Sequence, residues 1–304
     1  MGFNAFLVLH GPRIKRETSP GLNTPILTRE IINLHRDENS ILFAIYPETI
    51  IGNPIHAPNV IRWLLNYTSL LGGNRTFENE TVLAYSQSLA DDYLSQNSQL
   101  PEVLFVPAIT SREIEAQLDK PIRKRDGLQV LYAQKYRALG GVPNTNFDLC
   151  EEITRFGKDA PDRIKTLKLI REAELFHAYE NTTAISEACL LGTPVICHKN
   201  KYFSELIAQD ELPFSGISWN KKEIVKPDAS KNLTILRAAE VKSKEDISRI
   251  FSNLGSNSKV SEAHEIKLPK RSLVTRHSLT RGVKVLVQKG PIVFARFLKN
   301  YLDR

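Results

Sequence analysis

The chain has 304 residues, of which 41% are hydrophobic and 25% are charged, and it includes 15 Gly and 16 Pro. This is the composition of a globular protein, and it excludes collagen-like and disordered chains. No apolar run approaches the roughly 20 residues that cross a bilayer. A single core has usually stopped growing at this length, so we expect two lobes of about 100 to 150 residues each.

Cysteine usage indicates the redox compartment. Cys150, Cys189 and Cys197 are odd in number and form no Cys-x-x-Cys pair, which argues against a disulfide framework and against a zinc site. The N-terminal residues also lack a basic region followed by an apolar stretch and a small-residue cleavage site. We therefore expect a reducing, cytoplasmic location.

Short apolar runs bounded by turn residues predict buried parallel strands in the first part of the chain, at 6–9, 41–45, 82–85 and 103–106. Helical spacing predicts a helix over 26–34, capped by Thr24 with Pro25 at its first position. The same spacing predicts a helix over 60–65, before Gly72-Gly73. This alternation is typical of an α/β lobe.

A polar segment at 111–125 predicts the connection to the second lobe. The patterns that follow it predict a strand at 128–132, a helix at 162–174, a strand at 174–180, a turn at 181–183, a helix at 184–191 and a strand from 194. The predicted domains are an N-terminal lobe at 1–115, a C-terminal lobe at 126–260 and a tail at 261–304.

The tail carries the whole charge imbalance. Residues 260–304 hold ten Lys or Arg and three Asp or Glu, which equals the net charge of +7 for the chain. Leu279, Val283 and Leu286 recur at helical spacing among them, and a second such run follows Pro291, so we predict two basic amphipathic helices.

Two roles are open to this tail, and a third, nucleic-acid binding, is considered and not expected. The helices can pack on the body with a solvated basic face, or residues 275–304 can bind an anionic membrane and make the protein peripheral on the inner face of the plasma membrane. Nucleic acid is not expected as a partner, because the interleaved stacking aromatics and a recognisable binding module are missing.

One turn and helix point to chemistry. In an open parallel sheet, ligands bind beyond the carboxyl ends of the strands, where helix N-termini direct free N–H groups outward. Thr182 or Thr183 is placed to cap the helix that starts near Ala184, which suits a phosphate. Glu187 follows one turn later, within reach of the ribose of a nucleotide diphosphate. Its carboxylate can accept hydrogen bonds from the ribose hydroxyls.

The run Tyr179-Glu180-x-Thr182-x-x-x-x-Glu187-Ala188-x-x-x-Gly192-Thr193-Pro194-Val195-Ile196 resembles the donor-binding signature of GT-B glycosyltransferases. The earlier run Tyr46-Pro47-Glu48-x-x-x-Gly52-Asn53-Pro54, with Arg62-Trp63-Leu64-Leu65-Asn66 and Gly72-Gly73, is similar to the N-terminal lobe of bacterial surface-polysaccharide glycosyltransferases. The resemblance implies an α/β fold of two Rossmann-like lobes that face a central cleft, with the basic helical tail appended.

The resemblance also implies roles for individual residues. The donor belongs in the C-terminal lobe, with Glu187 on the ribose, Thr182 at the phosphates and Lys135 or Arg155 neutralising the leaving diphosphate. The predicted donor-binding residues are Lys135, Arg155, Tyr179, Glu180, Thr182, Thr183 and Glu187. No Asp-x-Asp triplet occurs, and GT-B enzymes generally act without a bound metal, so no metal and no cofactor besides the nucleotide sugar is expected.

An inverting transferase needs a base near the acceptor hydroxyl, and the candidates are His56 and Glu48, which follow the second predicted strand. Each chosen residue also has a structural alternative: a solvated helix carboxylate for Glu187, a local cap for Glu180, a surface histidine for His56 and a turn brace for Glu48.

The leading hypothesis is a metal-independent glycosyltransferase that moves a sugar to a glycan or lipid-linked hydroxyl acceptor in surface-polysaccharide synthesis. A non-catalytic nucleotide-sugar-binding partner and a GT-B-like sugar-nucleotide epimerase or hydrolase are the alternatives. The hypothesis stands on Glu187 at a cleft between two α/β halves, so burial of Glu187 in a solvent-free interior would leave this pattern no grounds for assigning sugar transfer.

Overall fold

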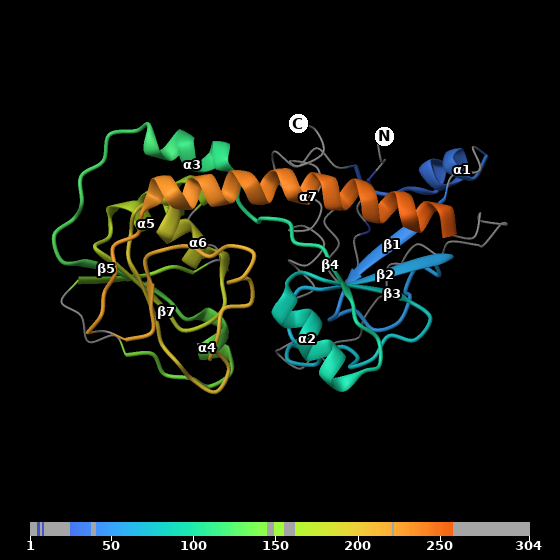
Figure 1. Ribbon diagram of the computed structural model, residues 1–304, viewed down its shortest axis with the longest axis horizontal. Coiled ribbons are helices and arrows are strands. Elements are labelled where there is room, and N and C mark those ends of the chain that lie inside the picture. Colours follow the sequence, from blue (N-terminus) through green and yellow to red (C-terminus); the bar gives the residue numbers. More distant parts are fainter. Residues whose placement is uncertain are drawn as a thin grey trace, which may run out of the picture. The chain divides into compact units, whose positions relative to one another are not determined.

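A computed structural model of the protein describes residues 5, 6, 8, 25–37, 41–144, 149–154, 162–220 and 222–257 (Figure 1). The predicted cap Thr24, the candidate Arg155 and the tail 261–304 with its two predicted helices lie outside the described residues. The predicted strand at 6–9 lies only partly within them.

The chain divides into two compact units, the first of residues 1–106 and 243–304 and the second of residues 107–242. The predicted lobes at 1–115 and 126–260 differ from these units in two places. Helix α3 (Ser111–Leu118) belongs to the second unit, and the long helix α7 (Ala229–Asn257) is divided between the two. Each unit contains one parallel sheet, so the fold class is α/β.

The sheet of the first unit has four parallel strands in the order β1-β2-β3-β4. The strands are β1 (Phe43–Pro47), β2 (Asn59–Leu64), β3 (Thr81–Ala84) and β4 (Glu102–Val103), with helix α2 (Gln87–Gln96) between the last two and α1 (Arg29–Asp37) before the first. Ile61, Trp63 and Leu83 form the core of this unit with Ile247 and Ile250 from α7.

The predicted helix at 60–65 is wrong, because these residues form β2 and its end. Ile61, Trp63 and Leu64 are all buried, and a strand that is buried on both faces reads as a continuous apolar run with no period of two. The predicted start of the first helix at residue 26 is also wrong. Helix α1 begins at Arg29, and Thr28 Oγ1 accepts the N–H of Ile31 over 3.3 Å.

The sheet of the second unit has five parallel strands in the order β6-β5-β7-β8-β9. The strands are β5 (Leu128–Tyr132), β6 (Leu149–Glu152), β7 (Leu175–Ala178), β8 (Val195–Cys197) and β9 (Ile217–Ser218). The helices are α4 (Gln134–Ala138), α5 (Arg163–Glu172) and α6 (Thr183–Leu190). The predicted strand at 128–132 and the predicted β-turn-α-β unit around residues 174–197 are confirmed.

Helices cover both faces of this second sheet. In Figure 1, α5 and α6 lie on one side of the sheet and α4 lies on the other. Tyr136 of α4 packs on Leu131 and Tyr179, while Leu167 and Ile170 are the buried residues of α5 with Thr166. Among the described residues, no helix combines the length and the apolar character that crossing a bilayer requires.

Candidate functional site

The candidate site is the carboxyl edge of the second sheet at the point where the strand order reverses. From β5 the chain goes to β6 on one side, and β7 pairs with β5 on the other. Ligands of open α/β sheets bind outside the carboxyl ends of the strands at such a reversal. Because α4 follows β5 and α6 follows β7, both helices begin at this edge. We call it the switch-point edge.

Glu180 links the two turns at the switch-point edge. Its Oε2 accepts the backbone N–H of Tyr136, in the first turn of α4, over 2.8 Å. Only 5% of the residue is exposed. Of the two roles considered for Glu180, the structure shows the local one: the carboxylate sits at a helix N-terminus, where it is favourable, and joins the turn after β7 to the turn after β5.

Tyr179 lies in a stack of rings beside Glu180. Its ring is stacked on Tyr136 at 5.4 Å and on His198 at 4.1 Å. Its hydroxyl accepts the N–H of Asn144 over 3.0 Å, and burial raises the pKa of this phenol. The side chain therefore fixes the segment after α4 over the sheet edge.

Thr182 caps α6 as predicted. Its Oγ1 accepts the N–H of Ala184 over 3.3 Å, and Thr182 and Thr183 are both half-buried. The first N–H groups of a helix have no partner within the helix and carry its positive dipole end, so this turn suits a phosphate. Lys135, also half-buried, lies in the first turn of α4, after β5.

The environment of Glu187 differs most clearly from the one that the sequence predicts. The residue is 0% exposed, and its Oε1 accepts a hydrogen bond from Arg163 Nη1 over 2.5 Å. A buried carboxylate that already pairs with a guanidinium is not the solvent-facing ribose ligand that the resemblance implies. The physical reason is the packing of α6 against α5, which brings the first residue of α5 to Glu187, and no spacing in the sequence reveals that contact.

Arg163 is the more exposed member of this pair, since its side chain is 27% exposed against 1% for Glu187. Its Nε also lies 3.7 Å from a carboxylate oxygen of Glu113 in α3. Burial alone lowers the pKa of Arg163, but the charge and hydrogen bond of Glu187 outweigh it, so the pKa stays above its usual value. The guanidinium is permanently charged and held in place.

Two histidines that sequence reasoning left without a function meet at the same edge. Nδ1 of His177 lies 2.9 Å from Nε2 of His198, and Nε2 of His177 lies 2.6 Å from Oε1 of Gln129. His177 is buried and His198 is half-buried. His177 lies in β7 opposite Ile196 of β8, and His198 is two residues after Ile196. Residues two apart along a strand share a face, so this spacing was the signal available in the sequence.

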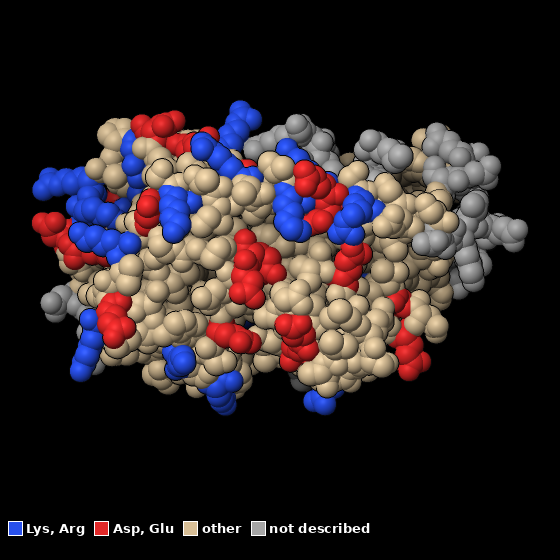
Figure 2. Space-filling view, viewed as in Figure 1, with Lys and Arg blue, Asp and Glu red and all other residues tan. Residues whose placement is uncertain are grey.

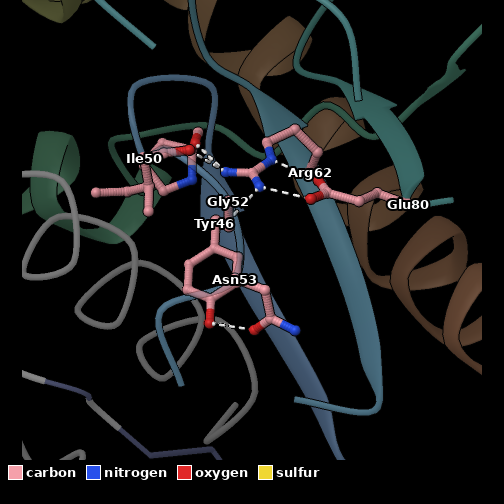
Figure 3. Close-up of polar contacts among 7 residues, drawn as sticks. Tyr46, Ile50, Gly52, Asn53, Arg62 and Glu80 are labelled. Carbon is pink, nitrogen blue, oxygen red and sulfur yellow. Dashed lines mark hydrogen bonds and ion pairs between the residues drawn. The ribbon is translucent and has the colours of Figure 1, made fainter. Parts of the chain in front are cut away.

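The loop between β1 and β2 is organised around Arg62, shown in Figure 3. This residue of β2 is 0% exposed. Its Nε and Nη2 donate to Glu80 over 2.7 and 2.8 Å, and Nη1 and Nη2 donate to three backbone carbonyls after β1, those of Pro47, Ile50 and Gly52. All five contacts are charge-assisted, so the loop after β1 has one fixed path.

His56 lies in this loop three residues before β2 begins, so it is toward the amino end of β2. Asn53 Oδ1 accepts the N–H of Ala57 over 2.9 Å and the hydroxyl of Tyr46 over 3.1 Å, and the backbone oxygen of Asn53 accepts the N–H of His56 over 3.0 Å. His56 is exposed and has φ +54°, which costs a non-glycine residue free energy. The surrounding hydrogen bonds therefore hold the backbone of His56 in an unfavourable conformation.

Glu48 lies inside the first unit. It is 3% exposed, and its Oε2 accepts the N–H of Leu65 over 2.9 Å, which joins the ends of β1 and β2. A Cβ at Gly73 would lie 2.1 Å from the backbone oxygen of Glu48, so only glycine fits beside this turn. Of the two base candidates, His56 reaches solvent and Glu48 has the geometry of a turn brace.

The opposite edge of the second sheet gathers basic side chains, and Figure 2 shows blue and red surface mixed over that end of the unit. Arg171 donates to carbonyls at the end of α3, those of Gln117, Leu118 and Lys120. Lys124 Nζ donates to the carbonyl of Ala173, which caps α5, over 2.6 Å, and burial lowers its pKa. Cations at helix C-termini are stabilised by the dipole, so this cluster is explained by structure alone.

Within the part of the chain that the structure describes, no three His, Cys, Asp or Glu side chains gather in a way that could hold a metal ion. Comparison of the whole chain with models of known protein families gave no match, and comparison with curated proteins gave none.

Proposed function

We propose that the protein is a glycosyltransferase that moves a sugar from a nucleotide diphosphate sugar to a hydroxyl acceptor. Burial of Glu187 removes the ribose contact on which the sequence hypothesis stood. The observation that carries the proposal is instead the switch-point edge of the second unit, where α6 begins after β7. Ligands with phosphate groups bind at such edges in α/β folds.

The phosphates of the donor are proposed to bind the N-terminus of α6, against the turn at Thr182 and Thr183. Lys135 is proposed to offset the charge of the leaving diphosphate. In sugar transfer the bond between the anomeric carbon and the phosphate oxygen breaks, and the electron pair leaves with the nucleotide diphosphate. Stabilising that departing charge is the largest effect available to the protein.

The acceptor is proposed to meet the first unit, with His56 as the base. A neutral imidazole can take the proton of the acceptor hydroxyl while the oxygen forms its bond to the anomeric carbon. The exposed position of His56 and its fixed loop support this role. The burial of Glu48 supports a structural role for that carboxylate.

The experiment is turnover with a panel of nucleotide sugars and hydroxyl acceptors, read as release of nucleotide diphosphate. We expect release to depend on the acceptor, and His56→Ala to abolish it while nucleotide binding persists. Release without an acceptor would indicate an epimerase or hydrolase instead. If no nucleotide or nucleotide sugar binds at millimolar concentration, the proposal fails.

The burial of Glu48, one of the two base candidates, favours one second candidate, a nucleotide-sugar-binding partner without turnover in polysaccharide assembly. It predicts binding of the donor with no release of diphosphate under any acceptor, and His56→Ala would then change nothing.

Cytoplasmic action in surface-polysaccharide synthesis is part of the proposal, with contact to the inner face of the plasma membrane through 275–304. Deletion of 275–304 is expected to abolish sedimentation with anionic vesicles. Unchanged sedimentation would remove the membrane from the proposal.

A further inference from the structure

The pair formed by Arg163 and Glu187 has an unused hydrogen-bonding group. Nη1 of Arg163 is taken by Glu187, while Nη2 is buried and finds no acceptor among the residues that the structure describes. A buried N–H group without an acceptor is costly. Unlike Glu187, the Arg163 side chain is 27% exposed, so a ligand that reaches the guanidinium can satisfy this group.

The position of the pair relates it to the switch-point edge. Arg163 is the first residue of α5, directly after its cap Asp162, so it lies where the helix begins at the carboxyl side of the sheet. Glu187 lies just past the first turn of α6, close to the turn at Thr182. A nucleotide with its phosphates at the start of α6 therefore places its ribose near this pair.

The charge balance indicates which part of a nucleotide is suited to Arg163. One guanidinium is faced by two carboxylates, Glu187 at 2.5 Å and Glu113 at 3.7 Å. The three side chains together carry a net negative charge, so they would repel a phosphate. A neutral hydroxyl oxygen accepts a hydrogen bond from Nη2 without that cost.

We propose that Arg163 is the side chain that contacts the nucleotide ribose, by donating Nη2–H to a hydroxyl oxygen, and that Glu187 is a positioning residue that holds the guanidinium in place. This inference rests on the proposed function, and it replaces the direct contact between Glu187 and the ribose. The recognition signal is then a donor on the protein and an acceptor on the sugar.

The experiment measures ribose preference by calorimetry on the full chain. UDP, GDP and ADP are each compared with their 2′,3′-dideoxy forms, and the tightest pair is carried forward. We expect the ribonucleotide to bind about tenfold more tightly than its dideoxy form, as for a hydrogen bond to a charged group. Arg163→Met should reduce that ratio to about one, and Arg163→Lys should retain part of it.

Glu187→Gln tests the positioning role, because the amide keeps the shape but no longer balances the guanidinium. We expect it to lower the preference for ribose to about threefold. The matched control is Lys165→Met, which removes an exposed cation from the same helix and should leave the ratio unchanged. The double variant Arg163→Met/Glu187→Met removes both charges of the buried pair and guards against loss of folding.

The two failures are distinguishable. If the native protein binds no nucleotide, the proposed function fails and takes this inference with it. If the native protein prefers ribose and a folded Arg163→Met or double variant keeps that preference, the proposed function survives and the role of Arg163 is overturned.

Discussion

The loops beside the two parallel sheets differ in polarity. In the first unit, the guanidinium of Arg62 collects three backbone carbonyls and fixes a loop that displays His56. In the second unit, helix N-termini meet at the edge, with the carboxylate of Glu180 on one of them. A fixed loop with an exposed imidazole suits a neutral hydroxyl group, whereas helix N-termini suit an anion. Under the proposed function, the first unit is assigned to the acceptor and the second unit to the donor.

Of the changes considered, removing Arg62 is expected to lower the free energy of unfolding the most. Arg62→Met leaves Glu80 and three carbonyls without their donor in the interior, and breaking such a buried pair costs about 3–5 kcal/mol of unfolding free energy. Urea denaturation measures the loss. Arg75→Met, at an exposed arginine that donates to Ser69, serves as the control and should stay within about 0.5 kcal/mol. Equal effects of the two changes would contradict the central role of Arg62.

The corresponding pair in the second unit is expected to tolerate joint removal. Glu187→Met alone leaves a buried guanidinium and should cost about 3 kcal/mol in unfolding free energy. Arg163→Met/Glu187→Met removes both charges, and we expect it to regain most of that loss, because an apolar pair avoids the desolvation penalty. Denaturation of both variants measures this. A double variant as unstable as the single one would show that the pair contributes more than charge balance.

The core of the second unit should weaken in alkali. Burial raises the pKa of the Cys197 thiol from its ordinary value of 9.0 to about 12, and it raises the pKa of the Cys189 thiol as well. Both thiols stay neutral in the folded state while the unfolded chain ionises above pH 9, so stability is complete below pH 9 and falls toward pH 12. At pH 10 the loss is about 1.4 kcal/mol for each thiol.

Denaturation from pH 8 to pH 11 of the native chain and of Cys189→Ala/Cys197→Ala isolates these thiols from other groups. The variant should show the flatter profile. Cys150→Ala, which changes a half-buried thiol, should follow the native slope more closely. Parallel curves for the native chain and the double variant would contradict the burial of the thiols.

Removing the cap of α6 should have a smaller effect on stability and a specific effect on binding. Thr182→Ala removes the hydroxyl that accepts the N–H of Ala184, which costs about 1 kcal/mol, and it should weaken binding of a nucleotide diphosphate. Thr234→Ala, at an exposed hydroxyl that donates to the carbonyl of Ser230 in α7, is the control. Thermal unfolding and calorimetry together measure both effects. Unaltered nucleotide affinity would exclude this turn as the phosphate site.

Relieving the backbone at His56 should have the smallest effect. His56→Gly removes the strain of φ +54° and should raise the free energy of unfolding by about 0.5 kcal/mol, while His56→Ala should leave it nearly unchanged. Both variants should lose sugar transfer. If the glycine variant is instead the less stable of the two, the loop does not store strain at His56.

The sequence predicted the elements whose signals are local. The strand Leu128–Tyr132, the cap Thr182 and the helix that follows it were found, because apolar runs and capping residues are local patterns. Strand β2 was mistaken for a helix, since burial on both faces erases the alternating pattern.

The candidate site was only partly accessible from the sequence, because its key contacts join distant residues. Arg163 and Glu187 are 24 positions apart, and Gln129 and His177 are 48 apart. No local pattern shows that α5 brings a cation to α6, so the carboxylate was expected to face a ligand. Knowing that a side chain is buried requires knowing what packs on it.

The central claim is that the turn between β7 and α6 binds the phosphates of a nucleotide. Amide hydrogen exchange on the full chain, with and without a nucleoside diphosphate that calorimetry shows to bind, tests it most directly. We predict slower exchange at residues 182–184 and around Lys135, with no change in the α3–β5 connection at 119–127. Protection at 119–127 alone, or no binding by any nucleotide, would contradict the claim.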